Sequence, residues 1–491
     1  MEKRSVKKNY FYNLLYQIVV ILVPIVTTPY LSRVLEADGI GTYSFIFSIV
    51  TYFTLFGTLG VAMYGQREIA YVQDDKAKRS KAFYEIIFFR FITIIISIIA
   101  YLICFGRSGE NSLYYRIFAL ELVANAFDIS WFFQGIEDFK KTVLRNVFVK
   151  VLSVCLIFLL VKTKEDLFIY ILIYVMSNVI GNLSLWLYLP KYLQKLKLKE
   201  LNLKKHIKPI LSMFIPQIAI QIYTVLDKTM IGVMLDDMSE VGFYEQSQKI
   251  VKVALVLVTA YGTVMCPRYA NAASNGDYMA IKKYLNKSFT IACMVGIAIT
   301  FGIIGISDNL VPWFLGEGYE KVKVLLKISA FLNIAIGLNN VSGVQYLVQI
   351  KKQNIFTISV IFGAIINFVL NIVFIYLFKS VGATIASIIA EFSILIYQLI
   401  YIKKNSDFKI SSLLSISIKY LISGVIMLFI LIAIGKILES NMISTLLMIL
   451  VGSVVYFVSL LILKDKFLIN TLSDLKVKLK REIFKENTDE R

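Results

Sequence analysis

Residues suited to metal binding, redox chemistry or covalent catalysis are scarce in this 491-residue sequence, which has one histidine and four cysteines. Cys104, Cys155, Cys266 and Cys293 lie far apart, so their spacing favours neither a disulfide framework nor a zinc site. No GxxxxGK(S/T), HExxH or GxSxG motif occurs. We therefore expect no catalytic residues, no bound metal and no cofactor, and a protein that is not an enzyme. The single histidine, His206, lies in a lysine-rich segment, where we expect it to be solvated.

Charged residues are also few, at 17% of the chain, whereas 58% of the residues are hydrophobic. Soluble globular proteins carry about half apolar and a quarter charged residues, so this composition excludes that class. The formal net charge is +19. In a nucleic-acid-binding protein such an excess gathers on one folded face, but here most of it lies in short segments between apolar runs. We expect no nucleic-acid partner.

Long apolar runs dominate what is present. A helix that spans a bilayer needs about 20 mainly apolar residues, and fourteen such stretches can be read between charged clusters. They lie near residues 9–32, 40–64, 83–105, 113–135, 143–161, 167–190, 209–234, 241–265, 286–306, 322–349, 354–378, 380–402, 412–435 and 442–463. The sequence therefore predicts an all-α polytopic membrane protein with about 14 transmembrane helices.

The spans fall into groups that suggest a domain organisation. Residues 1–190 form a predicted N-terminal six-helix lobe, 191–208 a basic cytoplasmic linker, and 209–404 a second six-helix lobe. Residues 405–465 hold two additional transmembrane helices. The tail, 466–491, has leucines at helical spacing opposed by lysines, which predicts an amphipathic basic helix on the membrane surface. A solvated tail is the alternative.

The distribution of positive charge predicts the orientation of the chain. Most of the 52 lysine and arginine residues fall in alternate segments between spans, beginning with the N-terminal one. Because cytoplasmic loops hold most of these residues in membrane proteins, both termini are predicted to be cytoplasmic. A missed span would invert the alternation after it, so the unbroken pattern also supports the number fourteen.

An internal repeat relates the two predicted lobes. At an offset of 201 residues, the second span aligns with the eighth. The matching positions are Gly41, Tyr43, Ile49, Val50, Thr58 and Arg67 with Gly242, Tyr244, Ile250, Val251, Thr259 and Arg268. Since the copies lie an even number of spans apart, both cross the membrane in the same direction, which predicts a parallel pseudo-repeat of the kind found in transporters.

Charged and polar side chains inside the spans are the candidate binding residues, because their burial in a membrane is costly unless they face a partner or a hydrated cavity. Several recur at intervals of three or four, which places them on single helix faces. The candidates are Arg90, Asp128, Lys150, Gln221, Asp227, Lys228, Glu245, Lys249, Lys252 and Glu391. Together they predict a hydrated, slightly cationic cavity between the lobes, suited to an anionic cargo.

Structural roles remain open for most of these candidates. Arg90 and Lys150 could extend to the membrane surface, and Glu245 could pair with Lys249. Asp227 with Lys228 could form an ion pair between the lobes. Asp128 and Glu391 could each serve only as a hydrogen-bonding group in the helix packing.

Five strings of the sequence resemble motifs of the Wzx-type polysaccharide flippases, a family that includes capsule and teichoic acid flippases. They are Thr27–Arg33 followed by Gly39–Ser44, Tyr64–Ala70, Asp128–Gly135, and Asp227–Gly232 with Gly242–Tyr244. The resemblance runs from about residue 8 to 465. It implies two six-helix lobes plus two further helices, the fold of a wider family that includes multidrug exporters and the peptidoglycan-precursor flippase. Peptidoglycan-precursor flippases have cationic residues on the cavity face of the first span. The first span of this chain has Gln17 and no lysine or arginine between Tyr10 and Ser32.

The resemblance further implies a cargo, an undecaprenyl-linked oligosaccharide or teichoic-acid-type precursor that moves from the inner to the outer leaflet by alternating access. The expected partners are this lipid-linked glycan, membrane lipids and, as an open possibility, Na⁺ or H⁺. Trp131, Tyr101, Tyr174 and Tyr223 are candidates to stack on sugar rings. A Na⁺- or H⁺-coupled exporter of small molecules is the alternative function, and a membrane-embedded enzyme of glycan assembly is a third.

Overall fold

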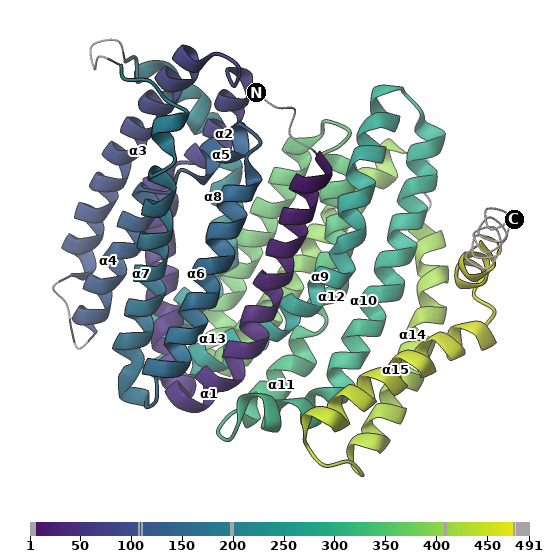
Figure 1. Ribbon diagram of the computed structural model, residues 1–491. Helices are drawn as coiled ribbons and strands as arrows, with labels where there is room; N and C mark the ends of the chain where they lie inside the picture. The colour runs from purple at the N-terminus through teal and green to yellow at the C-terminus, as the bar shows by residue number, and fades with distance from the viewer. Residues whose placement is uncertain are drawn as a thin grey trace, which may run out of the picture. The chain divides into compact units, whose positions relative to one another are not determined.

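The computed structural model describes residues 6–106, 109, 111–196, 201–406, 410–474 and 477, and within these residues it consists of helices and connecting turns (Figure 1). The helices before the predicted linker are α1 (Val6–Thr58), α2 (Val61–Tyr71), α3 (Lys76–Phe105), α4 (Ser112–Ala126), α5 (Ser130–Gly135), α6 (Phe139–Leu160), η1 (Lys164–Asp166), α7 (Leu167–Trp186) and η2 (Leu189–Lys191). Those after it are α8 (Lys204–Met234), α9 (Met238–Ser274), α10 (Tyr278–Leu315), α11 (Glu320–Ser329), α12 (Leu332–Asn339), η4 (Asn340–Leu347), α13 (Gln353–Asn405), α14 (Ile410–Gly435) and α15 (Met442–Ile462). The all-α prediction is confirmed.

Two of these helices are each broken once, so each contains two membrane-length helices. The backbone of α1 leaves the helical conformation at Glu36 (φ 56°), and that of α13 does so at Lys379 (φ 54°). Among the described residues, eleven stretches are long and apolar enough to cross a membrane, and the two stretches that contain these breaks count twice. α8, with 31 residues, is also long enough to cross a membrane. The eleven stretches, the two extra helices from the breaks and α8 together confirm the predicted number of fourteen.

The chain divides into two compact units. Unit 1 comprises residues 1–246 and 371–380, and unit 2 comprises 247–370 and 381–491. The lobe boundaries predicted from the basic linker stay a prediction. So does the amphipathic tail, which beyond Asp474 lies outside the described residues except for Val477.

In unit 1, helices α3, α4, α6 and α7 pack beside one another and against α1 (Figure 1). Aromatic rings fill this core: Tyr43 on α1 lies 5.7 Å from Phe118 on α4 and 4.9 Å from Tyr170 on α7, measured between ring centroids. In unit 2, α10 packs against α14 and α15, and the hydroxyl of Tyr456 donates a hydrogen bond to the Met294 carbonyl at 2.8 Å.

The pair of glycines that leads the internal repeat lies where α1 crosses α9 within unit 1. A Cβ atom at Gly41 would lie 1.8 Å from the carbonyl oxygen of Met238, and a Cβ atom at Gly242 would lie 2.0 Å from that of Ala37. The two backbones are therefore in direct contact. Small residues allow such close approach between membrane helices, so the shared glycines reflect a packing requirement of the two copies.

Substitution of Gly41 by alanine is expected to lower the free energy of unfolding by about 2–3 kcal/mol, because the added methyl group overlaps backbone atoms that cannot rotate away. Gly302→Ala is the matched control. A Cβ atom there would lie 3.9 Å from the nearest atom, the Cε of Met427, and alanine favours a helix more than glycine does. Thermal unfolding in detergent should show a lower Tm for Gly41→Ala only. Equal Tm values would contradict the close crossing.

Candidate substrate site

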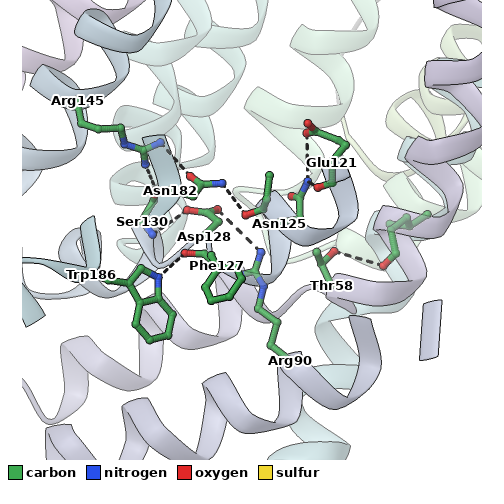
Figure 2. A network of polar contacts seen from close by, with 12 residues as sticks. Thr58, Arg90, Glu121, Asn125, Phe127, Asp128, Ser130, Arg145, Asn182 and Trp186 are labelled. Carbon is green, nitrogen blue, oxygen red and sulfur yellow. Dashed lines mark hydrogen bonds and ion pairs between the residues drawn. The ribbon is translucent and has the colours of Figure 1, made fainter. Parts of the chain in front are cut away.

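A network of buried and half-buried charged and polar side chains lies among α3, α4, α6 and α7 of unit 1 (Figure 2). Arg90, near the middle of α3, is only 1% exposed. Its Nη2 atom lies 4.0 Å from the Oδ2 atom of Asp128, while its Nε and Nη1 atoms are buried and make no hydrogen bond. Arg90 therefore does not extend to the membrane surface. A buried guanidinium with unsatisfied donors is costly and is well suited to hold an anion.

Asp128 lies in the turn between α4 and α5, and its Oδ1 atom accepts a hydrogen bond from the Ser130 backbone N–H at 2.9 Å. Ser130 also connects Asp128 to a second arginine, because the Nη2 atom of Arg145 donates to the Ser130 hydroxyl at 2.9 Å. The Nη1 atom of Arg145 donates to the side-chain oxygen of Asn182 on α7, also at 2.9 Å (Figure 2). One carboxylate thus stands beside two guanidinium groups, which leaves the network with a net positive charge.

Sequence reasoning missed Arg145 and Asn182. Arg145 lies in the second turn of α6 and near the start of an apolar run, close to the basic residues that precede it. Its position directly before Asn146 and five residues before Lys150 was the available signal. For Asn182 the available signal was Asn178, which lies one helical turn earlier on the same face of α7.

Two other charged residues on these helices, Glu121 and the predicted candidate Lys150, differ in their environment. Glu121 on α4 is buried and accepts hydrogen bonds from the side-chain amides of Asn125, at 3.2 Å, and Asn178, at 2.9 Å. This carboxylate is therefore satisfied by neutral groups. Lys150 on α6 is half-buried and has no ion-pair partner among the residues that the structure describes. Lys150 thus adds a cation that no described acidic group neutralises.

A second cluster in unit 1 joins α8, α9 and a short part of α13. The Nζ atom of Lys228 lies 2.9 Å from the Oε2 atom of Glu245, and both side chains are largely buried. Asp227 accepts hydrogen bonds from the Tyr244 hydroxyl and, at 2.7 Å, from the side-chain amide of Asn371. Lys228 is therefore paired with Glu245, whereas Asp227 accepts hydrogen bonds from neutral groups.

The remaining candidates belong to other surroundings. Gln221 is half-buried on α8, Lys249 is half-buried on α9, and Lys252 is exposed on the same helix. Glu391 on α13 is 8% exposed, and its Oε2 atom accepts a hydrogen bond at 2.6 Å from the side chain of Asn339. The joint lining of one cavity by all ten predicted residues stays a prediction.

The expectation of a solvated His206 is wrong, since its side chain is 1% exposed. Its Nδ1 atom lies 2.7 Å from the Tyr64 hydroxyl, and its Nε2 atom lies 3.0 Å from the Oε2 atom of Glu85. Glu85 is also fully buried and forms an ion pair with Lys205 at 2.6 Å. These contacts fasten the start of α8 to α2 and α3. The local sequence does not indicate this role, because the neighbours of His206 are lysines and its partners lie more than 100 residues away in the chain.

Burial lowers the pKa of His206, which precedes the predicted span of α8, and the hydrogen bond that the imidazole donates to Glu85 offsets this only in part. The unfolded chain, with a histidine pKa of about 6.5, therefore binds more protons than the folded protein below that pH. Stability should be fully present above about pH 6.5 and fall as the pH drops through the lower folded-state pKa. The Tm should be lower at pH 5.5 than at pH 7.5, and this decrease should be larger in the wild type than in His206→Gln. An identical fall in both would exclude His206 as the source.

Aromatic residues proposed to stack on sugars lie in different places. Trp131 and Tyr101 are 1% and 0% exposed, and Tyr101 donates a hydrogen bond to the Tyr115 carbonyl at 3.0 Å. Both are core residues, so these two assignments are wrong. Tyr174 is half-buried, and the side chain of Tyr223 lies outside the described residues.

Residues 6–273 match the family model described as polysaccharide biosynthesis protein. The chain belongs to this family. This polysaccharide biosynthesis protein is 24% identical over 408 residues to the "Putative O-antigen transporter" of Escherichia coli (strain K12), an alignment that covers 82% of this chain and 98% of that protein.

Two solved structures show the fold of this family member. The lipid II flippase MurJ, in an inward closed conformation, matches with a TM-score of 0.69 and 16% identity over 92% of this chain and 100% of that one. An inward-facing multidrug resistance MATE family transporter of the MOP superfamily matches with a TM-score of 0.60 and 14% identity, over 78% of this chain and 98% of that one. The predicted membership of a flippase family and the transporter fold are confirmed.

Two of the strings that carried the resemblance pack against each other in this polysaccharide biosynthesis protein. A Cβ atom at Gly65 on α2 would lie 2.5 Å from the ring of Trp131 on α5, and a Cβ atom at Gly135 would lie 2.8 Å from the Gln66 carbonyl oxygen. The motifs around these glycines therefore build the contact between α2 and α5. Asp128, at the start of the second motif, is the member that reaches the arginine network.

Proposed function

We propose that this family member is a flippase that moves an undecaprenyl-linked oligosaccharide from the inner to the outer leaflet of the bacterial cytoplasmic membrane by alternating access. The observation that carries the proposal is the half-buried cationic network of unit 1, in which the buried Arg90 keeps two donors without a protein partner. A lipid-linked glycan crosses the membrane with a charged pyrophosphate and a polar sugar, both of which need charged and polar groups inside the bilayer.

The arrangement supports a binding role for Arg90 more strongly than a purely structural one. A structural ion pair gains from short, fully satisfied contacts, whereas the Arg90 guanidinium approaches Asp128 only at 4.0 Å. A pyrophosphate has several acceptor oxygens and could satisfy the remaining donors with charge-assisted hydrogen bonds. Arg145, linked to Asp128 through Ser130, and the half-buried Lys150 extend the positive field along α6.

The likeness in sequence favours this function over the export of small molecules. The Escherichia coli relative aligns over nearly its whole length and carries the name of an O-antigen transporter, while the likeness to the multidrug transporter concerns the fold alone. We further propose that both termini are cytoplasmic, on the basis of the alternating positive charge. Teichoic-acid-type precursors belong to the same chemical class of cargo. Coupling to Na⁺ or H⁺ stays a proposal for the acidic candidates Asp128 and Glu391.

Depletion of the protein in the bacterium that encodes it tests the proposal. Undecaprenyl-linked oligosaccharide should accumulate on the inner side of the membrane, while the amount of glycan at the cell surface falls. Re-expression of the wild-type chain should restore both. Increased sensitivity to lipophilic cations, with unchanged surface glycan, would instead favour an exporter.

A further inference from the structure

A cavity of about 1040 Å³ lies in unit 2, between the end of α9, the start of α10, the turn after η4 and the end of α13. Five lysines from three separate parts of the chain line it, and we call it the basic pocket. They are Lys282, Lys351, Lys352, Lys403 and Lys404. No acidic residue is among the residues that line it, and none of the five lysines forms an ion pair with a described acidic residue.

We propose that the basic pocket binds the phosphate-bearing headgroup of a lipid at the inner surface of the membrane. The positive-inside tendency accounts for lysines in these loops, but it does not require lysines of three segments to face one cavity. Basic pockets between helices on the cytoplasmic side are suited to anionic lipid headgroups. The volume is also far larger than an inorganic phosphate needs and falls at the upper end for organic ligands.

The wall of the pocket suits an amphipathic ligand. Part of its lining consists of the buried side chains of Ile281, Leu285 and Tyr346, which belong to an apolar core cluster of unit 2. The lysines that line it are exposed, as are neutral hydrogen-bonding groups such as Ser274 and Asn405. A ligand could therefore place apolar atoms against the buried side chains and phosphate oxygens beside the exposed lysines.

A tight turn places Lys351 and Lys352 at the pocket. Lys351 has φ 63°, in the left-handed region, and the following N–H, of Lys352, donates to the Leu347 carbonyl at 2.8 Å. These features describe the end of a helix at which glycine is normally favoured, because other residues are strained there. Lys351 lies four residues after the end of η4 at Leu347, and this turn brings Lys351 and Lys352 together to the wall of the pocket.

Two lipids carry the required chemistry, and the test separates them. The full-length protein is purified in a neutral detergent, and the binding of phosphatidylglycerol, undecaprenyl pyrophosphate and phosphatidylcholine is measured by native mass spectrometry. We expect at least one of the two anionic lipids to bind tenfold or more tightly than phosphatidylcholine. Binding of phosphatidylglycerol identifies a site for membrane lipid, and selective binding of undecaprenyl pyrophosphate identifies a site for the cargo anchor.

Variants then assign the binding to the pocket. The triple change Lys351→Ala, Lys403→Ala, Lys404→Ala should weaken binding of the anionic lipid at least tenfold, and arginine at the same three positions should retain it. Removal of three exposed lysines elsewhere, Lys76, Lys78 and Lys140, is the control with equal loss of charge. Equal binding by the pocket and control variants at unchanged Tm would overturn the proposal. The assay needs no transport, so its failure leaves the proposed function untouched.

Discussion

Replacement of Arg90 by glutamine is expected to reduce the transport of lipid-linked glycan by roughly ten- to a hundred-fold, since a hydrogen bond to a charged group contributes about 1.5–3 kcal/mol. Arg90 is buried near the middle of α3 with two unsatisfied donors. If the pyrophosphate satisfies these donors during transport, a neutral side chain cannot replace them. The initial rate of glycan transfer in proteoliposomes measures the effect.

The same change should leave the Tm equal or raise it. Burial of the Arg90 charge is costly because two of its donors have no hydrogen-bond partner, and a neutral side chain removes that cost. Asp128, which would be left without Arg90, is 27% exposed and keeps its hydrogen bond from the Ser130 N–H. Arg116→Gln is the matched control: this arginine is exposed near the start of α4 and donates to the Gly106 carbonyl at 2.9 Å. Unchanged transport by Arg90→Gln, or loss of transport only together with loss of folded protein, would assign Arg90 a structural role.

Removal of one partner of the Lys228 and Glu245 pair should destabilise the protein by about 3 kcal/mol, because the charge left behind is buried without its neighbour. The pair is 2.9 Å long, and its side chains are 11% and 14% exposed. We expect Lys228→Met and Glu245→Gln each to lower the Tm in detergent. The loss of unfolding free energy in the double variant should be about 2 kcal/mol smaller than the sum of the losses in the two single variants, because the two residues interact directly.

An exposed pair of nearly equal length provides the control for this cycle. Lys327 and Asp308 are 2.8 Å apart, but their side chains are 38% and 64% exposed. Solvent screens such pairs, so the coupling there should be about 0–1 kcal/mol. Similar coupling energies in both cycles would show that Lys228 and Glu245 do not gain from burial.

The number and class of the helices could be predicted because they follow from local composition. Each span is an apolar run of membrane length, and positive charge alternates between the runs. The glycine pair of the repeat could likewise be found in the sequence, although its role as a backbone contact became visible only in the structure.

The partners of the charged residues could not be predicted in the same way. A polar stripe shows which residues share a helix face, but the rotation of that face depends on packing with helices far away in the chain. Arg90 meets Asp128, Lys228 meets Glu245, and Glu391 meets Asn339. Helical spacing indicates none of these pairs.

His206 and Trp131 show the same limit. Local sequence suggests a solvated histidine and an accessible aromatic ring, whereas both side chains are buried. The partners of His206 are Tyr64 and Glu85, and the Trp131 ring lies against Gly65. Each of these contacts joins segments more than 60 residues apart, for which neighbouring residues give no signal.

The most direct test of the account is the movement of a lipid-linked glycan by the purified protein. Proteoliposomes with the wild-type chain and an undecaprenyl-pyrophosphate oligosaccharide in one leaflet should show transfer to the opposite leaflet, detected by a reagent that modifies only outward-facing sugars. Arg116→Gln should match the wild type and Arg90→Gln should not. Transfer no faster than in protein-free vesicles, across several glycans and imposed ion gradients, would contradict the flippase function.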